Sequence, residues 1–177
     1  MNSPTIALLL LALTVPGLSQ QTKEDSAMKD CPMHEHPSSG HHAVVESHGD
    51  QAMGFPHDAT THHFRLMSNG GAIEVSANNP DDKANAQAIR FHLKHIAAMF
   101  SDGDFSTPMF IHDGIPPGTT TMRLMKAAIH YTYEEMLSGG RVRIQSDDPV
   151  AVAAIHDFLR FQITEHQTGD SPESSKQ

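Results

Sequence analysis

The sequence predicts an α+β domain: a two-layer sandwich in which a mainly antiparallel sheet of four or five strands is covered on one face by two long helices. Three observations predict it. Alternating apolar runs flank two Gly-Gly pairs, an apolar helical stripe follows each hairpin, and this hairpin–helix pattern occurs twice, over 62–100 and 129–166. One unit has too little core to fold alone, whereas two units can bury their apolar surfaces against each other.

The first unit begins with a β-hairpin. Phe64 and Leu66 alternate before the segment Ser68-Asn69-Gly70-Gly71, and Ile73 and Val75 alternate after it. Glycine tolerates the positive φ that tight hairpin turns need. The pattern therefore predicts two antiparallel strands joined by a turn at the glycines.

A helix follows this hairpin, from Asp81 to about Phe100. Asn79-Pro80-Asp81 is typical of a helix start, because proline fits the first turn and acidic side chains favour the positive end of the helix dipole. Apolar residues then recur three and four positions apart, as in a helix with one buried face. These residues are Ile89, Leu93, Ile96 and Phe100.

The second unit repeats the same features. Gly139-Gly140 occupies the position of Gly70-Gly71, and Asp148-Pro149 that of Asn79-Pro80. Val142 and Ile144 repeat Ile73 and Val75, and, after a shift of about three residues, Ala154-Ile155, Leu159 and Arg160 repeat Ala88-Ile89, Leu93 and Lys94. The pattern favours a duplicated unit; the alternative is that common turn and helix signals recur by chance.

The two units differ in their histidines. When the two units are aligned, Tyr131 corresponds to His62, Thr132 to His63, and Phe161 to His95. This asymmetry predicts that the first unit holds the function and that the second provides packing. His166 lies on the apolar stripe of the second helix near its end, where a structural role explains it.

Between the units lies a connector. Pro108 to His112 reads as a short apolar strand that stops at His112, and Thr119-Thr120-Thr121 can cap a short helix. A histidine at the point where a strand gives way to a loop is a candidate functional residue.

Four regions divide the chain. Residues 1–19 resemble a secretory signal peptide, with an apolar run from Ile6 to Val15 and a small-x-small site at Gly17-Leu18-Ser19. Residues 20–54 are predicted to be a disordered His- and Met-rich leader, 55–168 a single domain, and 169–177 a polar tail. The protein is therefore expected to be secreted or periplasmic, with no membrane span in the mature chain.

Composition excludes several classes of function. The formal charge is −9 with no basic run, which argues against nucleic acid as a partner. No nucleotide-binding, nucleophile-elbow or His-Glu-x-x-His motif is present. The single cysteine cannot form an internal disulfide. The unusual entries are 14 histidines and 10 methionines.

The leader concentrates possible metal ligands. Thiol, thioether and imidazole groups together suit Cu(I) and Zn(II) better than cations that prefer oxygen. The candidates are Met28, Cys31, Met33, His34, His36, His41, His42 and His48. The alternative is a His-rich linker with incidental ligands.

One short segment of the leader resembles a known motif. Cys31-Pro32-Met33-His34 is similar to the Cys-Pro-Met-His core of the heavy-metal-binding segment of bacterial copper-efflux proteins, which normally continues with Pro where Glu35 stands here. The resemblance covers about six residues and implies copper as the ion, with another metal-handling protein as a candidate partner. The body resembles small uncharacterised secreted bacterial proteins, which implies no activity.

A second metal site is expected in the body. His92, His95 and Met99 fall in one stripe on the flank of the first long helix, and an ion needs further ligands from another element. His62 or His63 of the hairpin, and His112 after it, are the candidates; alternation places His62 on the face of Phe64 and His63 on the other. The predicted metal ligands are thus Cys31, Met33, His34, His36, His62, His63, His92, His95, Met99 and His112. Each body residue could instead be an ordinary core or surface residue.

Three functions remain open. The first is a metal-binding protein that binds, sequesters or delivers copper, with zinc as the alternative ion. The second is a metalloenzyme or haem-binding protein that uses the same histidines. The third is a structural or partner-binding domain with a His-rich linker. The sequence favours the first.

Overall fold

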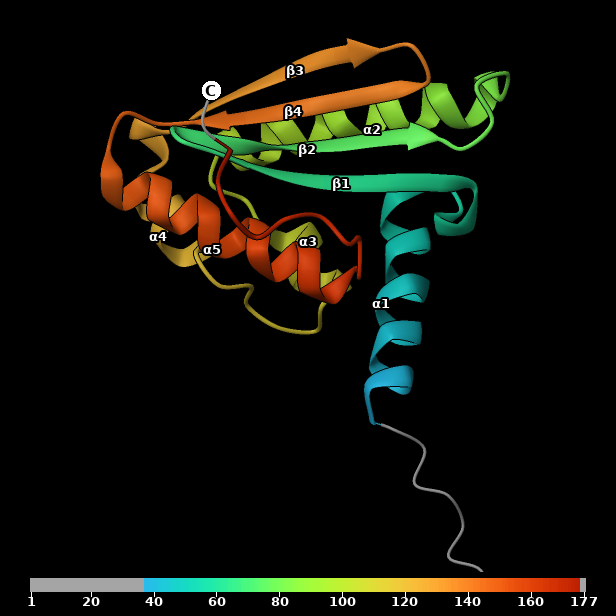
Figure 1. Cartoon of the computed structure of the whole chain (residues 1–177), viewed down its shortest axis with the longest axis horizontal. Helices are drawn as coiled ribbons and strands as arrows, with labels where there is room; N and C mark the ends of the chain where they lie inside the picture. Colours follow the sequence, from blue (N-terminus) through green and yellow to red (C-terminus); the bar gives the residue numbers. More distant parts are fainter. Residues whose placement is uncertain (1–36, 176–177) are drawn as a thin grey trace, which may run out of the picture. The chain divides into compact units, whose positions relative to one another are not determined.

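The computed structural model of the chain describes residues 37–175 (Figure 1). They form an α+β domain with a four-stranded antiparallel sheet and five α-helices. In chain order the elements are α1 (Pro37–Met53), η1 (His57–Ala59), β1 (Thr60–Met67), β2 (Gly70–Ala77), α2 (Lys83–Ser101), α3 (Ser106–Ile111), α4 (Thr119–Leu124), η2 (Lys126–Ala128), β3 (His130–Met136), β4 (Gly139–Gln145) and α5 (Pro149–Glu165).

The strand order in the sheet is β1-β2-β4-β3, so the second strands of the two hairpins meet at its centre. The hairpins close in the same register, with Met67 opposite Gly70 and Met136 opposite Gly139. The central pairing is also symmetric, because Gly70 faces Gln145 at one end while Gly139 faces Ser76 at the other.

One face of the sheet is apolar and is covered by helices, as Figure 1 shows. α2 packs mainly on β3 and β4, and α5 packs on β1 and β2, so each long helix covers chiefly the hairpin of the other unit. The predicted stripe of α2 is buried in this core together with the apolar residues of α5. Each of these helices begins with an aspartate that accepts hydrogen bonds from the first turn, Asp82 in α2 and Asp148 in α5.

The Gly-Gly pairs lie at the starts of β2 and β4 rather than inside the turns. The first turn consists of Ser68 and Asn69. A Cβ on Gly71 would collide with the Cδ1 of Leu159 and the carbonyl of Arg65, and one on Gly140 would lie 2.8 Å from the ring of Tyr133. Glycine is required here because it lets the helices approach the sheet closely.

Helix α1 differs from the sequence prediction, which placed residues 37–53 in a flexible leader. Its apolar pattern is weak, yet Val45 is buried and the helix packs against α3 and α2. The ring of His48 stacks on Phe110 with centroids 4.8 Å apart. These contacts with distant segments stabilise a helix that has little amphipathic signal of its own. The domain therefore has three long helices, not two.

The connector also differs from the prediction. Ser106–Ile111 forms helix α3, where a strand was predicted from Pro108 to His112. Pro108 lies in the first turn of this helix, where its missing N–H has no intrahelical partner to lose. His112 is the C-terminal cap of α3. The short helix predicted after Thr119 is present as α4.

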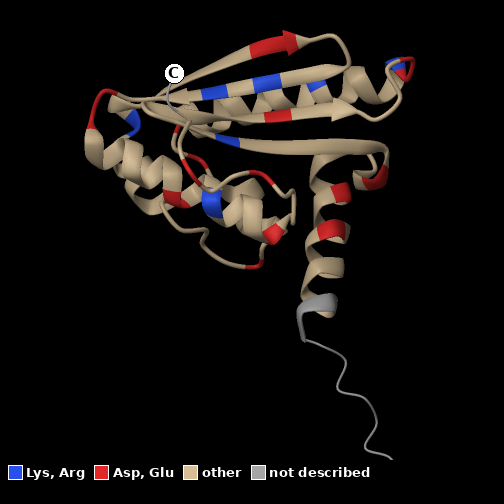
Figure 2. Cartoon of the chain, in the orientation of Figure 1, with Lys and Arg blue, Asp and Glu red and all other residues tan. Residues whose placement is uncertain are grey.

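Ser175, the last described residue, lies along the edge strand β1. Ser175 donates its backbone N–H to the carbonyl of Leu66 at 3.0 Å and forms a bridge with Met67. The outer, polar face of the sheet mixes acidic and basic side chains: Figure 2 shows basic residues on β4 between strands β2 and β3, which carry acidic ones. Among the described helices, none combines the length and apolar character that a membrane crossing requires.

Candidate functional site

Three half-buried histidines from three elements line one partly open cavity of about 60 Å³. Alternation along β1 places His62 on the core face, beside Phe64. His92 projects from the flank of α2, and His166 follows the last turn of α5 as its C-terminal cap. Met53, from the end of α1, completes this wall of the cavity. We call His62, His92 and His166 the interior histidine cluster.

The rings of the cluster are linked through direct and aromatic contacts. His62 and His166 are nearly parallel, with centroids 6.1 Å apart and 9° between the planes. The ring of Phe55 links His62 and His92, with its centroid 6.4 Å from that of His62 and 5.7 Å from that of His92. One face of the cluster is thus held by an aromatic side chain that cannot compete for the imidazole nitrogens.

All three imidazoles are neutral at neutral pH. Burial is the main cause that lowers the pKa of His62 to about 4, with the nearby charges of His57 and His63 as smaller causes. Burial likewise lowers the pKa of His92 to about 4 and that of His166 to about 3. A neutral imidazole has one unprotonated nitrogen, so each of these rings can act as a metal ligand without losing a proton.

A fourth histidine, His112, contacts the cluster through His166, with ring centroids 5.1 Å apart. Its Nε2 is 3.2 Å from the Oε1 of Gln162, and a proton on Nε2 makes this a hydrogen bond. Its buried Nδ1 has no hydrogen-bond partner in the described part of the chain, and the Glu165 carboxylate is 3.8 Å away. Burial lowers the pKa of His112 despite the opposing effects of Gln162 and Glu165.

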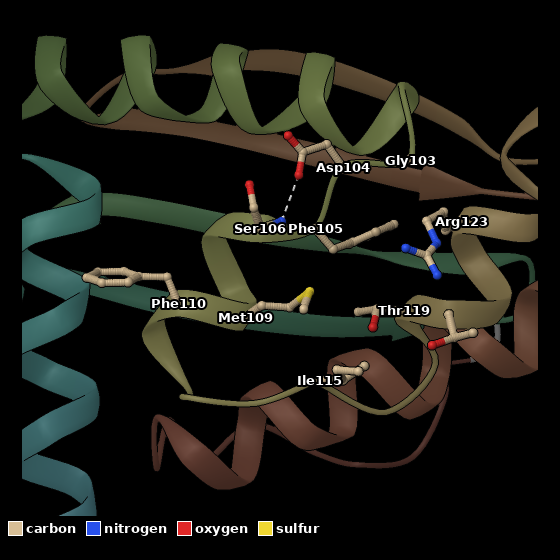
Figure 3. Close-up of a pocket in the computed structure, with 10 residues that line it drawn as sticks. Gly103, Asp104, Phe105, Ser106, Met109, Phe110, Ile115, Thr119 and Arg123 are labelled. Carbon is tan, nitrogen blue, oxygen red and sulfur yellow. Dashed lines mark hydrogen bonds between the residues drawn. The ribbon is translucent and has the colours of Figure 1, made fainter.

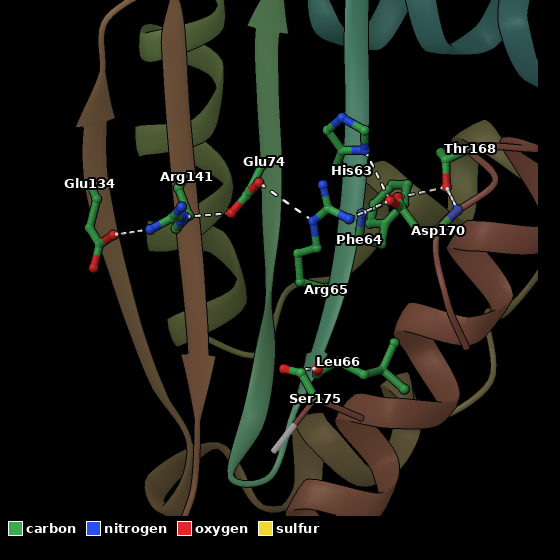
Figure 4. A network of polar contacts seen from close by, with 10 residues as sticks. All are labelled: His63, Phe64, Arg65, Leu66, Glu74, Glu134, Arg141, Thr168, Asp170 and Ser175. Carbon is green, nitrogen blue, oxygen red and sulfur yellow. Dashed lines mark hydrogen bonds and ion pairs between the residues drawn. The ribbon is translucent and has the colours of Figure 1, made fainter. Parts of the chain in front are cut away.

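The structure separates His63 from His62, as alternation predicts. His63 lies on the outer face, with its Nδ1 3.0 Å from Asp170, which also accepts a hydrogen bond from Arg65 (Figure 4). Burial raises the pKa of Asp170, but the hydrogen bonds from Phe64, Thr168 and His63, together with the charge of Arg65, outweigh burial and lower it. His63 therefore belongs to a polar network outside the cavity.

The remaining predicted ligands do not join the cluster. His95 is exposed to solvent on α2. Met99 is half-buried, and its sulfur accepts a hydrogen bond from the hydroxyl of Thr107 at 3.7 Å. The four leader residues Cys31, Met33, His34 and His36 lie outside the described residues.

Sequence reasoning missed two members of the site. His166 was assigned to packing, and Met53 was placed in the leader. A signal for His166 existed: it aligns with Phe100 of the first unit, a core position. A histidine at a core position of a repeat is a candidate site residue. Met53 had no comparable signal.

Two further cavities lie in the described domain. One, of about 220 Å³, adjoins the cavity of about 60 Å³, and Met53, His62 and His166 line both. The other, of about 410 Å³, lies between α3 and α4 (Figure 3). Its walls are apolar apart from Arg123, Asp104, Ser106 and two threonines, and it contains no histidine.

Within residues 37–175, no three His, Cys, Asp or Glu side chains converge closely enough to hold a metal ion as they stand. The parallel rings of His62 and His166 illustrate this, because their in-plane lone pairs do not point to a common centre. Metal binding at the cluster therefore requires rotation of side chains.

No family model matches the sequence, and neither a curated protein nor a solved structure resembles it closely enough to count as a match.

Proposed function

We propose that the protein binds copper and that the interior histidine cluster is its site for one Cu(I) ion. The observation that supports this most is the convergence of His62, His92 and His166 on one cavity in the neutral form. Buried histidines with a structural role are usually hydrogen-bonded. These three are half-buried, form no hydrogen bond to another described residue through their ring nitrogens, and line a hollow beside a thioether.

The cavity suits a monovalent soft ion better than a divalent one. Its lining includes imidazole and the thioether of Met53 but no carboxylate. Imidazole and thioether ligands favour Cu(I) over Ca²⁺, Mg²⁺ or Mn²⁺. Burying a single positive charge among neutral ligands also costs less than burying two.

Ligation needs the cluster rings to turn toward one another. Imidazole nitrogens bind first-row metals at about 2.0–2.1 Å, so the facing rings of His62 and His166, now 6.1 Å apart, would have to tilt. His166 lies at the end of α5, and the cavity beside it leaves space for this movement. His112 contacts His166, and its buried Nδ1, which has no hydrogen-bond partner among the described residues, is available as a further ligand.

The leader fits the same proposal as a capture or transfer segment. Its Cys-Pro-Met-His core resembles a copper-handling motif, and the apolar segment 6–15 resembles the signal of a secreted or periplasmic protein. We propose that Cys31, Met33, His34 and His36 bind the ion first and exchange it with another metal-handling protein or with the cluster.

Of the alternatives, haem is disfavoured by size. The cavity of about 60 Å³ is far below the roughly 300–1,000 Å³ of pockets that hold organic ligands. A zinc-dependent enzyme would need an open coordination position and a group that activates water. A purely structural role of the histidines is the outcome against which the following experiment is designed.

The test is Cu(I) titration of the full chain against a chromophoric chelator under reducing conditions. The starting variant has Cys31→Ser, Met33→Ala, His34→Ala and His36→Ala, so that leader ligands do not obscure the body. His92→Ala in this background is expected to weaken Cu(I) binding at least about 100-fold, because it removes a direct ligand.

His95→Ala is the matched control, since His95 lies one helical turn from His92 but is exposed. We expect the control to bind Cu(I) as the background does. No Cu(I) binding by the background variant, or equal losses for the two histidines, would contradict the proposed site.

We also infer that the two hairpin–helix units arose by duplication. Their hairpins close in the same register, the central strands pair symmetrically, and Leu159 and Leu93 contact corresponding glycines. In this view Tyr131 in the second unit's strand and Phe100 in the first unit's helix are aromatic, whereas their counterparts His62 and His166 are imidazoles.

A further inference from the structure

The cavity of about 220 Å³ that adjoins the interior cluster is also lined by a second group of metal-ligating side chains. His42 and Glu46 come from α1, and His57 comes from η1. His42 and Glu46 are four residues apart, which places them on the same face of the helix. None of these three residues belongs to the copper site proposed above.

One carboxylate oxygen faces both imidazoles. The Oε1 of Glu46 is 3.2 Å from the Nδ1 of His42 and 3.4 Å from the Nε2 of His57. In a tetrahedral zinc site with metal–ligand bonds of about 2.0–2.1 Å, two neighbouring ligand atoms are roughly 3.3 Å apart. The two spacings thus match those between ligand atoms that share one small ion.

The other nitrogen of His57 has a fixed partner. Its Nδ1 is 3.0 Å from one oxygen of Asp50 and 3.1 Å from the other, and Asp50 also accepts the backbone N–H of His57 at 2.7 Å. When Nδ1–H donates to Asp50, the lone pair of Nε2 points toward the lone pairs of Glu46. Such an arrangement repels unless a proton or a cation lies between the two atoms.

A carboxylate that accepts the second ring N–H of a histidine is also the usual support of a metal ligand. It fixes the tautomer and the orientation of the ring, and it makes the free nitrogen more basic. Asp50 occupies this position relative to His57.

We propose that His42, Glu46 and His57 form a second metal site, for a borderline divalent cation such as Zn²⁺, with Asp50 as the residue that positions His57. Two imidazoles and a carboxylate are a typical zinc donor set, and the adjoining cavity leaves room for water as the fourth ligand. The carboxylate balances part of the charge of a divalent ion, which the interior cluster cannot do.

Some closure of the site is required. The three donor atoms do not yet surround a common point, in line with the lack of a ready metal group in residues 37–175. The side chains of His42, Glu46 and His57 are 25%, 37% and 39% exposed, so rotation toward an ion displaces water rather than packed core atoms.

The experiment is isothermal titration of the full chain with Zn²⁺ alone, in the variant that lacks the four leader ligands. We expect one saturable site. Glu46→Gln should weaken Zn²⁺ binding at least about 100-fold while it keeps a hydrogen-bonding oxygen between the histidines. Asp50→Asn should weaken it roughly 10- to 100-fold, as loss of a supporting hydrogen bond does.

His48→Ala is the matched control, because His48 lies on the same helix but bonds to the carbonyl of Phe110 instead. It should leave Zn²⁺ binding unchanged, and His42→Ala should abolish it even if Glu46→Gln proves too unstable to measure. Circular dichroism checks the fold of each variant.

The outcome is independent of the copper proposal. His92→Ala should lose Cu(I) but keep Zn²⁺, and Glu46→Gln should do the reverse. Absence of a Zn²⁺ site in the parent variant, or equal losses of Zn²⁺ affinity for His42→Ala and His48→Ala, would overturn the proposal, because Glu46 would then merely link two imidazoles by hydrogen bonds. Loss of Zn²⁺ binding in His92→Ala would also overturn it, because only one site would then exist.

Discussion

Two ring pairs occupy corresponding places in the two hairpin–helix units. His62 of β1 pairs across the hairpin with Val75, and Tyr131 of β3 pairs with Ile144 in the same register. His62 contacts His166, with ring centroids 6.1 Å apart, whereas Tyr131 contacts Phe100 at 6.0 Å. The spacing is the same, but one pair consists of imidazoles and the other of aromatic rings.

The two pairs also differ in how closely they are packed. Phe100 is 2% exposed and packs against Phe105 and Phe158, with ring centroids 4.6 and 5.9 Å away. Both rings of the histidine pair line the cavity of about 60 Å³, whereas of the aromatic pair only Phe100 does. His62 and His166 are only half-buried. Corresponding positions of the two hairpins and helices therefore differ in packing: Phe100 is packed among three aromatic rings, whereas His166 is half-buried at the cavity. We therefore expect the histidine pair to contribute less to the stability of the domain than the aromatic pair does.

The largest difference between the two pairs is expected when the ring at each helix end, Phe100 or His166, is replaced by alanine. Phe100→Ala is expected to destabilise the domain by about 3–5 kcal/mol, since it opens a cavity within three packed aromatic rings. His166→Ala should cost at most about 1–2 kcal/mol, because its side chain is only half-buried and its polar ring is partly removed from water. Urea unfolding of both variants measures the difference.

Both variants should keep the far-UV circular dichroism of the parent at zero urea. Equal losses of unfolding free energy would show that the histidine pair packs as the aromatic pair does, and the reasoning from the hollow would fail.

Local patterns predicted much of this arrangement. Alternation along β1 correctly separated His62 from His63, and the period of α2 correctly predicted its buried stripe. The same geometry explains why His95 is exposed: at 100° per residue it lies about 130° from the centre of the stripe, whereas His92 lies about 70° away. The stripe of His92, His95 and Met99 thus turns away from the core, and only His92, its member nearest the buried face, lines the cavity.

The rest depended on contacts between distant segments. Helix α1 has few apolar residues, and its place is fixed by Val45, by His48 on Phe110 and by His41, whose Nε2 is 2.6 Å from the carboxylate of Glu165. No local pattern announces such contacts. The cluster likewise needed the knowledge that α5 crosses β1, which brings His166 to His62.

The second prediction concerns pH. The folded pKa values of about 4, 4 and 3 for His62, His92 and His166 lie below the unfolded value of 6.5. Between pH 6.5 and 4 the unfolded chain therefore binds more protons, so metal-free protein should lose stability as the pH falls. Each of these histidines contributes a slope of up to about 1.4 kcal/mol per pH unit.

His166→Phe, which copies Phe100, should remove the part of this slope that belongs to His166. Tyr131→Phe is the control: burial raises the pKa of Tyr131, so this residue does not titrate in the acidic window. Urea unfolding at several pH values in the presence of a chelator gives the slopes. An unchanged slope in His166→Phe would mean that the imidazole is already protonated or exposed in the folded protein.

The smallest effect is expected at His63, the neighbour of His62 on the opposite face. Its ring is 37% exposed and pairs with Asp170, whose carboxylate keeps hydrogen bonds from Phe64, Arg65 and Thr168 when His63 is removed. His63→Ala should therefore cost less than about 1 kcal/mol of unfolding free energy, as half-exposed ion pairs do. Cu(I) affinity should stay unchanged, whereas His62→Ala should lose it. Because the two residues are adjacent in the chain, any general disturbance of β1 would affect both variants alike. A loss of Cu(I) in His63→Ala, with His62→Ala unaffected, would place the ion on the outer face of the sheet and reject the interior cluster as its site.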